Sequence, residues 1–304
     1  MERKAIAFSP AHITGLFQIC DQPKDPLFRG SRGAGFSLTK GVKTTVHVQK
    51  SVKKSVEVKI NGETTESAEV SKSVANTFLS LARANHRILV EHEVEVPIGC
   101  GLGSSGASAL SLALAMNEAL ALKLSRVKAA QIAHVAEVEC KTGLGTVIAE
   151  MVGGVEIRVE PGAPGVGVIK SIPVNDNCSA VCLCFNSIAT KKVLTDLRLR
   201  KPINKFGGDL VDKLIGQPHI RNFMEFSRRF AESTGLISEK VKKVLTQTDS
   251  VGIPCSMAML GDTVFSIVKQ DEIEELFKIF QLHTQHDRGI ITAEIDIKGA
   301  RILK

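Results

Sequence analysis

The stretch PIGCGLGSSGASAL, residues 97–110, decides how the rest of this chain is interpreted. It contains a GxGxxG pattern from Gly101 to Gly106, the usual written form of the dinucleotide-binding fingerprint. Residues 88–96 before it alternate like a strand, whereas residues 107–122 after it are apolar nearly all round, as in a buried helix. The stretch is therefore predicted to be a glycine-rich turn that leads from a strand into a helix.

The residues that follow argue against a bound dinucleotide. A dinucleotide-binding unit needs a second strand that ends in Asp or Glu about 20 residues past the glycines. Here a second helix is predicted instead over 126–141, with Ser125 as its N-cap and Gly143 after its end. The phosphate-loop pattern GxxxxGK[ST] is also absent from the sequence.

Two interpretations of the loop then remain. In one, the free N–H groups at the start of helix 107–122 bind a phosphate, and the hydroxyls of Ser104 and Ser105 bond its oxygens or coordinate Mg²⁺. In the other, the glycines form a tight turn that only packs a buried helix. The motif alone leaves these two interpretations nearly balanced.

Composition limits the class of protein. The chain has 304 residues, 43% hydrophobic and 23% charged, which is enough for two domains with substantial cores. No run approaches the roughly 18 apolar residues of a membrane span, and the apolar part of the N-terminus is too short for a signal peptide. We therefore expect a cytoplasmic protein that makes no contact with a membrane.

Charge and cysteine usage narrow the class of ligand. The net charge of +7 suits an anionic ligand, but without Trp or Tyr, and with its basic residues spread out, the chain is not expected to bind nucleic acid. The seven cysteines indicate reduced thiols. Cys178, Cys182 and Cys184 lack a second pair of ligands for zinc, so they are expected to be small buried hydrophobic residues.

The pattern along the chain predicts an α+β protein of two domains. Strands are predicted within 42–60, a helix over 68–87, and a strand pair over 147–160 around Gly153-Gly154. A turn-rich segment follows, so the boundary is placed between domains 1–167 and 168–304. The second domain alternates predicted strands with predicted helices; the strands cover 180–185, 263–268 and 289–297, and the helices 206–215, 219–234, 237–247 and 271–284.

The 97–110 stretch also resembles the second signature of the GHMP kinases, PxxxGLGSSA, whose loop and helix bind the triphosphate of ATP. AFSPAHITGLFQI, residues 7–19, is similar to their first signature, with His12 where many members have Arg. Further segments resemble the archaeal pantoate kinases within that superfamily, so that the likeness extends over most of the chain; they are 29–41, 142–165, 226–238 and 255–268. The usual glycine-rich third signature is absent, and SMAMLGDTVF stands in its region.

The resemblance implies a two-domain GHMP-kinase fold with the active site in the cleft between the domains. The N-terminal domain would be like domain 2 of ribosomal protein S5, and the C-terminal domain would be ferredoxin-like. The implied reaction transfers the γ-phosphoryl group of ATP to (R)-pantoate, giving 4-phosphopantoate and ADP in archaeal coenzyme A synthesis. The family also suggests a homodimer. A GHMP kinase for another small hydroxy acid remains an alternative.

The resemblance assigns the nucleotide and metal residues. The ATP-binding positions would be Pro97, Gly101, Leu102, Gly103, Ser104, Ser105 and Gly106. Glu137 matches the Mg²⁺-binding Glu of the family, and Ser105 would complete an oxygen-rich set with the phosphates of ATP. From the residues alone, Glu137 shares a helix stripe with His134 and Lys141, which a solvated helix edge with a local ion pair also explains.

The resemblance also assigns the pantoate residues. His134 would face the substrate, and Arg158 would hold its carboxylate with two hydrogen bonds. Alternation around Arg158 equally fits an exposed polar strand face. Ser31 and Arg32 lie in a glycine-rich segment that could close over the same substrate, while His12 would line the pocket or be a buried, hydrogen-bonded histidine.

Thr146 departs from the pattern of the family. Related pantoate kinases read GLGD where this chain reads GLGT, and that Asp is their candidate catalytic base. A threonine hydroxyl cannot act as a base near neutral pH. Three explanations stay open: an inactivated variant, a slower transfer that relies on positioning and electrostatics, or a non-catalytic relative that still binds its ligands.

Overall fold

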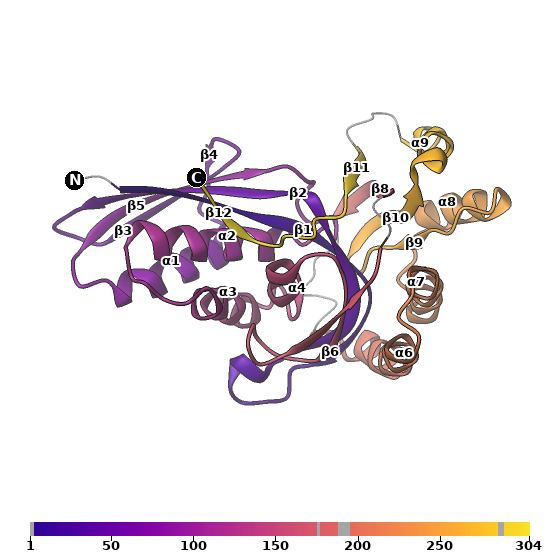
Figure 1. Cartoon of the computed structure of the whole chain (residues 1–304), viewed down its shortest axis with the longest axis horizontal. Helices are drawn as coiled ribbons and strands as arrows, with labels where there is room; N and C mark the ends of the chain where they lie inside the picture. The colour runs from indigo at the N-terminus through magenta and orange to yellow at the C-terminus, as the bar shows by residue number, and fades with distance from the viewer. Residues whose placement is uncertain (1–2, 175–176, 188–194, 285–288) are drawn as a thin grey trace.

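The computed structural model describes residues 3–174, 177–187, 195–284 and 289–304, which form two β-sheets with helices packed against them (Figure 1). The first sheet has eight strands, six of them in the order β12-β1-β2-β5-β3-β4, with β6 pairing β2 and β7 pairing β6. Its strands are β1 (Arg3–Cys20), β2 (Gly30–Lys50), β3 (Ser55–Ile60), β4 (Glu63–Thr64), β5 (His86–Val94), β6 (Val155–Glu160), β7 (Val168–Ile172) and β12 (Arg301–Leu303).

A long antiparallel hairpin of β1 and β2 runs through the whole molecule. The strands have 18 and 21 residues, and they are joined by a short 3-10 helix, η1 (Pro26–Phe28). At the open end of the hairpin, the start of β1 pairs with β12 and the end of β2 pairs with β5. Closer to the turn, the first part of β2 pairs with β6. The molecule has two parts, one built on the first sheet and the other on the second. Because the hairpin extends along the first sheet toward the second, residues near the middle of β1 lie where these two parts meet.

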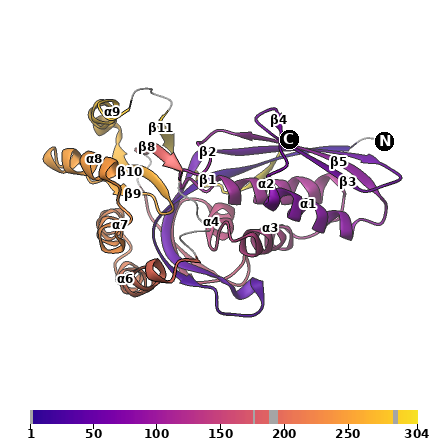
Figure 2. The same cartoon turned by 180° about the vertical axis from the view of Figure 1, so that it is seen from behind.

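Three helices cover one face of the first sheet, as Figures 1 and 2 show from opposite sides. They are α1 (Glu69–Leu81), α2 (Ser104–Ala119) and α3 (Arg126–Cys140). Helix α2 is buried on nearly all sides, which explains why its sequence is apolar all round. It begins three residues before the predicted start at 107, so both serines of the glycine loop lie in its first turn.

The predicted strand pair over 147–160 is only half right. Residues Thr146–Val152 form helix α4, which ends at Gly153 and Gly154, both with positive φ, and only Val155–Glu160 form a strand. The run VIAEMV contains β-branched residues that favour strands, but Val147, Ile148 and Ala149 are buried, and α4 packs against α2. Tertiary packing therefore overrides the local preference.

The second sheet is antiparallel with four strands in the order β11-β8-β10-β9. Its strands are β8 (Cys178–Ser187), β9 (Ser256–Met257), β10 (Gly261–Lys269) and β11 (Ile290–Glu294). The helices of this part are α6 (Leu197–Gly216), α7 (Ile220–Thr234), α8 (Glu239–Ser250) and α9 (Ile273–Gln281), with the 3-10 turn η2 (Gln270–Glu272) before α9. The α+β fold expected from the sequence is thus confirmed.

Segments on both sides of the boundary predicted at residue 167 contribute to the first sheet and to one hydrophobic core. Strand β7 follows that boundary but pairs with β6, and β12 returns to pair with β1. Just before β12, the N–H of Ala300 donates to the carbonyl of Glu150 in α4. Phe36 of β2 lies 6.1 Å from Phe223 of α7 and 5.4 Å from Phe265 of β10, measured between ring centroids, so one aromatic cluster joins the parts.

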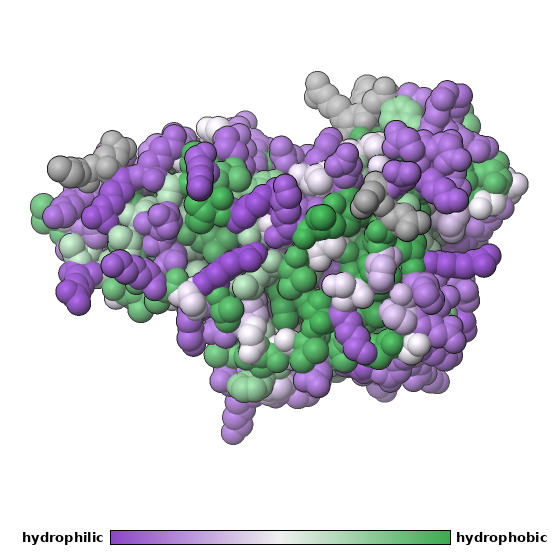
Figure 3. All heavy atoms as spheres, in the orientation of Figure 1, coloured by the Kyte–Doolittle hydropathy of each residue, from purple (hydrophilic) through white to green (hydrophobic). Residues whose placement is uncertain are grey.

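Two further features of the structure are the membrane-spanning potential of its helices and the burial of its thiols. Over the residues that the structure describes, no helix is long and apolar enough to cross a membrane. Cys182 and Cys184 are buried free thiols, as expected, whereas Cys178 is a free thiol that is only partly buried. In Figure 3, polar residues cover both ends of the visible face, and apolar residues gather in its middle, where the two parts meet.

Candidate active site

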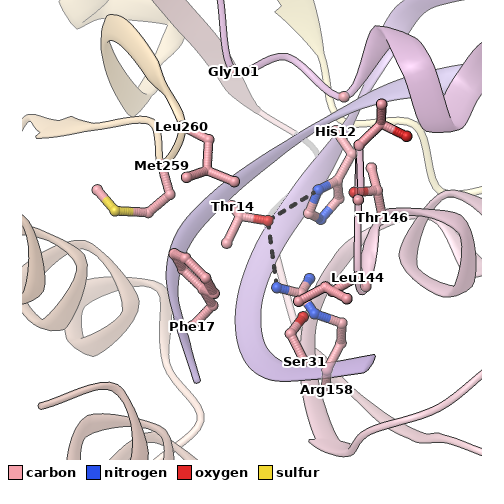
Figure 4. Close-up of a pocket in the computed structure, with 14 residues that line it drawn as sticks. His12, Thr14, Phe17, Ser31, Gly101, Leu144, Thr146, Arg158, Met259 and Leu260 are labelled. Carbon is pink, nitrogen blue, oxygen red and sulfur yellow. Dashed lines mark hydrogen bonds between the residues drawn. The ribbon is translucent and has the colours of Figure 1, made fainter. Parts of the chain in front are cut away.

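A pocket opens where the two parts of the molecule meet. Its walls come from β1, the start of β2, the glycine loop, residues 142–146, β6 and residues 259–260 (Figure 4). Of the residues singled out in the sequence, it gathers His12, Ser31, Thr146 and Arg158 with the loop glycines Gly101 and Gly103. Segments far apart in the sequence therefore face one cavity.

The glycine loop has the geometry of an anion site. Gly101 and Gly103 have φ values of +80° and +67°, which side chains rarely tolerate. Gly103 caps α2 without a capping side chain, so the N–H groups of Ser104, Ser105 and Gly106 are left at the start of the helix. A Cβ at Gly106 would lie 3.1 Å from the Cβ of Thr146, so glycine allows α4 to pack close behind the loop.

The C-terminal part holds the loop in place. The hydroxyl of Thr263 donates to the carbonyl of Cys100 at 2.7 Å, and Gly261 packs so closely on Cys100 that a Cβ there would overlap its carbonyl oxygen. On the other side, the N–H of His12 donates to the carbonyl of Leu102 at 3.0 Å. The Leu102 side chain itself is buried in the core, so Leu102 contributes to the site through its backbone.

Glu137 of α3 forms a buried carboxylate beside the first turn of α2. Its Oε1 accepts hydrogen bonds from Ser105 Oγ at 2.5 Å and from Thr142 Oγ1 at 2.7 Å. Burial raises the pKa of Glu137, although both hydroxyl bonds act in the opposite direction. The described residues hold no cluster of three or more His, Cys, Asp or Glu side chains suited to a metal. One carboxylate with neighbouring hydroxyls nevertheless fits Mg²⁺, which takes most of its other ligands from phosphates and water.

A second buried carboxylate, Glu156, lies on β6, the strand that also carries Arg158 of the pocket wall. Glu156 Oε1 accepts from Arg158 Nη1 at 2.5 Å and from His12 Nε2 at 3.1 Å. Arg158 is 1% exposed, and its Nη2 donates to Thr14 Oγ1 at 3.3 Å. Its Nε has no hydrogen-bond partner among the described residues. A buried guanidinium with an unused donor beside a pocket is suited to bind a carboxylate.

Ser31 and Thr146 complete the wall next to Arg158. A Cβ at Gly145 would lie 2.2 Å from Ser31 Oγ and 2.9 Å from Arg158 Nε, so both groups approach this glycine. Thr146 is the first residue of α4, and its methyl group lies 3.0 Å from the Cβ position of Gly103. The hydroxy amino acid that departs from the family pattern is therefore next to the glycine loop.

The structure does not bring Arg32 or His134 to this pocket. Arg32 Nε donates to the carbonyl of Val159 at 2.8 Å, and its guanidinium pairs with Asp212 of α6. Adjacent strand residues point to opposite faces, so Ser31 faces the cavity while Arg32 does not. His134 Nε2 lies 3.0 Å from the carbonyl of Arg29 and 3.2 Å from that of Pro26, where it holds the segment before Ser31.

Sequence reasoning missed three polar groups at the site. Glu156 lies on the side of β6 for which an exposed polar face was one of two interpretations, yet it is fully buried, because this side of β6 faces His12 of β1. Glu150 of α4 is also fully buried, and neither of its carboxylate oxygens has a partner among the described residues. Thr14 lies two residues after His12 on β1, so its position on the same strand face could have been inferred.

The comparisons with known proteins agree with this geometry. Residues 69–154 match the family model of the GHMP kinases N terminal domain. The pantoate kinase of Thermococcus kodakarensis is 35% identical over 277 residues, covering 88% of this chain and 89% of that protein. The pantoate kinase of Methanocaldococcus jannaschii is 34% identical over 274 residues, covering 90% and 96%.

Among solved structures, one described as a phosphotransferase related to the CoA biosynthesis pathway superposes with a TM-score of 0.88. It is 32% identical, and the match covers 98% of each chain. The likeness thus extends through both sheets and across the pocket between them. This chain belongs to the archaeal pantoate kinase family of the GHMP kinases.

Proposed function

We propose that this protein is an ATP-dependent pantoate kinase. The observation that carries the proposal is the buried Arg158, whose unpartnered Nε lies beside Ser31 in a pocket that also contains the glycine loop. One end of the cavity thus suits a small carboxylate and the other suits a triphosphate. A hydroxy acid held by its carboxylate would present its hydroxyl toward the loop.

Each end of the pocket has a separate task in this mechanism. The N–H groups of Ser104, Ser105 and Gly106 would bind the phosphates of ATP. Arg158 and Ser31 would bind the carboxylate of pantoate, so that its terminal hydroxyl is aligned with the γ-phosphorus. Ser105 and Glu137 would hold Mg²⁺, which offsets the negative charge that spreads over the transferred group.

Thr146 keeps a second candidate function open. Because this side chain cannot accept a proton, the chain could bind ATP and pantoate without transferring phosphate. Phosphoryl transfer depends mainly on positioning and electrostatics, which the proposed roles of Arg158, Ser105 and Glu137 would supply. We therefore favour an active kinase over a silent relative.

An ADP-release assay with Mg-ATP tests this function. Pantoate, pantothenate, mevalonate, shikimate and homoserine would be offered separately, and turnover is expected with pantoate. Turnover confined to one of the other four would overturn the proposal. Binding of ATP and pantoate by calorimetry with no ADP release, but with turnover restored in Thr146→Asp, would identify the silent relative instead.

A further inference from the structure

His12 lies in the pocket wall with one ring nitrogen bound and the other facing a hydroxyl. Its side chain is 1% exposed, yet it lines the cavity (Figure 4). The ring packs over Gly35 of β2, where a Cβ would lie 2.5 Å from Nε2. Glycine at that position therefore lets the imidazole lie flat against the strand and reach Glu156.

Hydrogen bonds fix which nitrogen carries the proton. Glu156 is an acceptor at 3.1 Å from Nε2, so Nε2 donates to it. Thr14 Oγ1 accepts from Arg158 Nη2, so its own hydroxyl hydrogen can turn toward His12 Nδ1, which lies 3.4 Å away. Neutral His12 thus presents an unprotonated Nδ1 to the pocket side, held by a contact long enough to be replaced easily.

The same contacts place Nδ1 near both ligands of the proposed reaction. Nδ1 of His12 and Nη2 of Arg158 both contact Thr14 Oγ1, so the base and the carboxylate site are separated by one hydroxyl group. The carbonyl of His12 lies 2.9 Å from the Cβ position of Gly103, so its backbone borders the glycine loop. A short hydroxy acid bound to Arg158 would therefore bring its hydroxyl toward Nδ1 and the loop.

We propose that His12 is the catalytic base of this chain, with Glu156 as its positioning residue; the inference rests on the proposed kinase function. The substrate hydroxyl oxygen forms a bond to the γ-phosphorus while the bond from that phosphorus to the β,γ-bridging oxygen breaks, and the electron pair leaves with ADP. The hydroxyl proton moves to Nδ1 of His12. Glu156 stabilises the imidazolium until the proton passes to water.

The charged surroundings suit a base at His12 more than one at position 146. Glu156 and Arg158 of β6 contact the same network, and Glu150 of α4 and Glu137 of α3 are further buried ionisable groups near the loop. A protonated His12 would face the Glu156 carboxylate directly. Thr146, which approaches the loop through its methyl group, offers no such acceptor.

His12→Gln tests the inference against a matched control. We expect kcat to fall about 100-fold, with a much smaller change in KM for pantoate and ATP, and the acid limb of the pH–rate profile to disappear. His92→Gln is the control, because His92 is also a 1% exposed histidine in the first sheet, bonded to Thr44 and Ser71 away from the pocket. It should retain the kcat and the pH profile of the parent protein.

A second substitution that restores kcat to His12→Gln would show that this variant is folded and lacks only a catalytic base. In His12→Gln combined with Thr146→Asp, the new carboxylate lies beside the loop, so at least a tenfold recovery of kcat is expected, with activity extending to lower pH. Glu156→Gln should shift the acid limb without abolishing binding of pantoate, as measured by calorimetry. Unchanged kcat and an unchanged acid limb in His12→Gln would overturn the assignment of His12, whereas lack of pantoate turnover by both the parent protein and Thr146→Asp would overturn the kinase function itself.

Discussion

Two buried carboxylates, Glu156 of β6 and Glu137 of α3, bond to residues that line the pocket, and they are compensated in opposite ways. Glu156 is bonded to the Arg158 guanidinium and to His12, so its charge is balanced inside the protein. Among the described residues, the Glu137 carboxylate accepts hydrogen bonds from the hydroxyls of Ser105 and Thr142 alone, and burial raises its pKa. We propose that the first region binds an anion through Arg158 Nε, the guanidinium donor that has no partner among the described residues. The second still needs a cation, and Mg²⁺ would supply it.

The largest effect is expected when the guanidinium of Arg158, the cation bonded to Glu156, is removed. Arg158→Ala takes away the carboxylate donor and leaves Glu156 buried with only His12 as a partner. Loss of one member of a buried charge pair costs about 2–5 kcal/mol. We therefore expect KM for pantoate to rise at least about 100-fold, with KM for ATP changed far less, in steady-state assays.

Arg158→Lys provides the control for this prediction. It keeps the positive charge but loses the planar donor pair, so its KM for pantoate should lie between those of the parent and Arg158→Ala. Equal increases in KM for pantoate and ATP in Arg158→Ala would contradict the assignment of this end of the pocket to the carboxylate.

Glu137→Gln tests the second region. Removal of the charge should lower kcat about 100-fold at fixed Mg²⁺ and raise the Mg²⁺ concentration needed for half-maximal activity. Glu137→Gln is thus expected to impair activity, but without Mg²⁺ it should stabilise the folded protein at alkaline pH. Because the folded-state pKa of Glu137 is raised, the parent loses stability as pH rises through that value, and Glu137→Gln does not.

Thermal unfolding with and without Mg²⁺, from about pH 5 to about pH 9, measures this difference in stability between the parent protein and Glu137→Gln. The two proteins should have similar Tm at the acid end, and the variant should be more stable at the alkaline end. If the parent were instead the more stable protein at alkaline pH without Mg²⁺, Glu137 would have a compensating cation of its own.

The smallest expected effect concerns Glu150. Neither a cation nor a hydroxyl group is bonded to its carboxylate among the described residues. Its pKa is raised well above the usual range by burial and by the nearby Glu137 and Glu156. Stability that depends on its neutral form is present at low pH and is lost as pH rises through the raised pKa. Glu150→Gln should therefore add about 1–3 kcal/mol to the free energy of unfolding at alkaline pH and much less at acid pH.

Urea unfolding at several pH values checks this prediction, with Glu139→Gln as the control. Glu139 lies on the exposed side of α3, so its replacement should change stability by no more than about 0.5 kcal/mol at any pH. A pH-independent effect of Glu150→Gln would show that its carboxyl group does not titrate in this range.

Local patterns in the sequence predicted the parts of the site that depend on nearby residues. The glycine loop lies before a buried helix, and Ser125 caps α3 by accepting from the N–H of Lys128. Arg158 is in a strand, as expected, but the alternation could not show that its polar face is covered by β1. Strand periodicity, applied to Ser31 and Arg32, would have excluded Arg32 from the cavity.

Contacts between distant segments could not be predicted in this way. The bond from Thr263 to Cys100 joins residues 163 positions apart, and the bond from His12 to Glu156 joins residues 144 apart. Neither pair lies on one element, so no periodicity connects them. Helix α4 was missed for a related reason, since its helical form depends on packing against α2.

The return of the chain to α4 sets an order for assembly during protein synthesis. Arg126 Nη2 donates to the carbonyls of both Met151 and Ala300, and the N–H of Ala300 donates to Glu150. Residue 300 leaves the ribosome after the whole second sheet has been made. The end of α4, the helix that begins at Thr146, therefore gains these bonds late, after the second sheet has been synthesised.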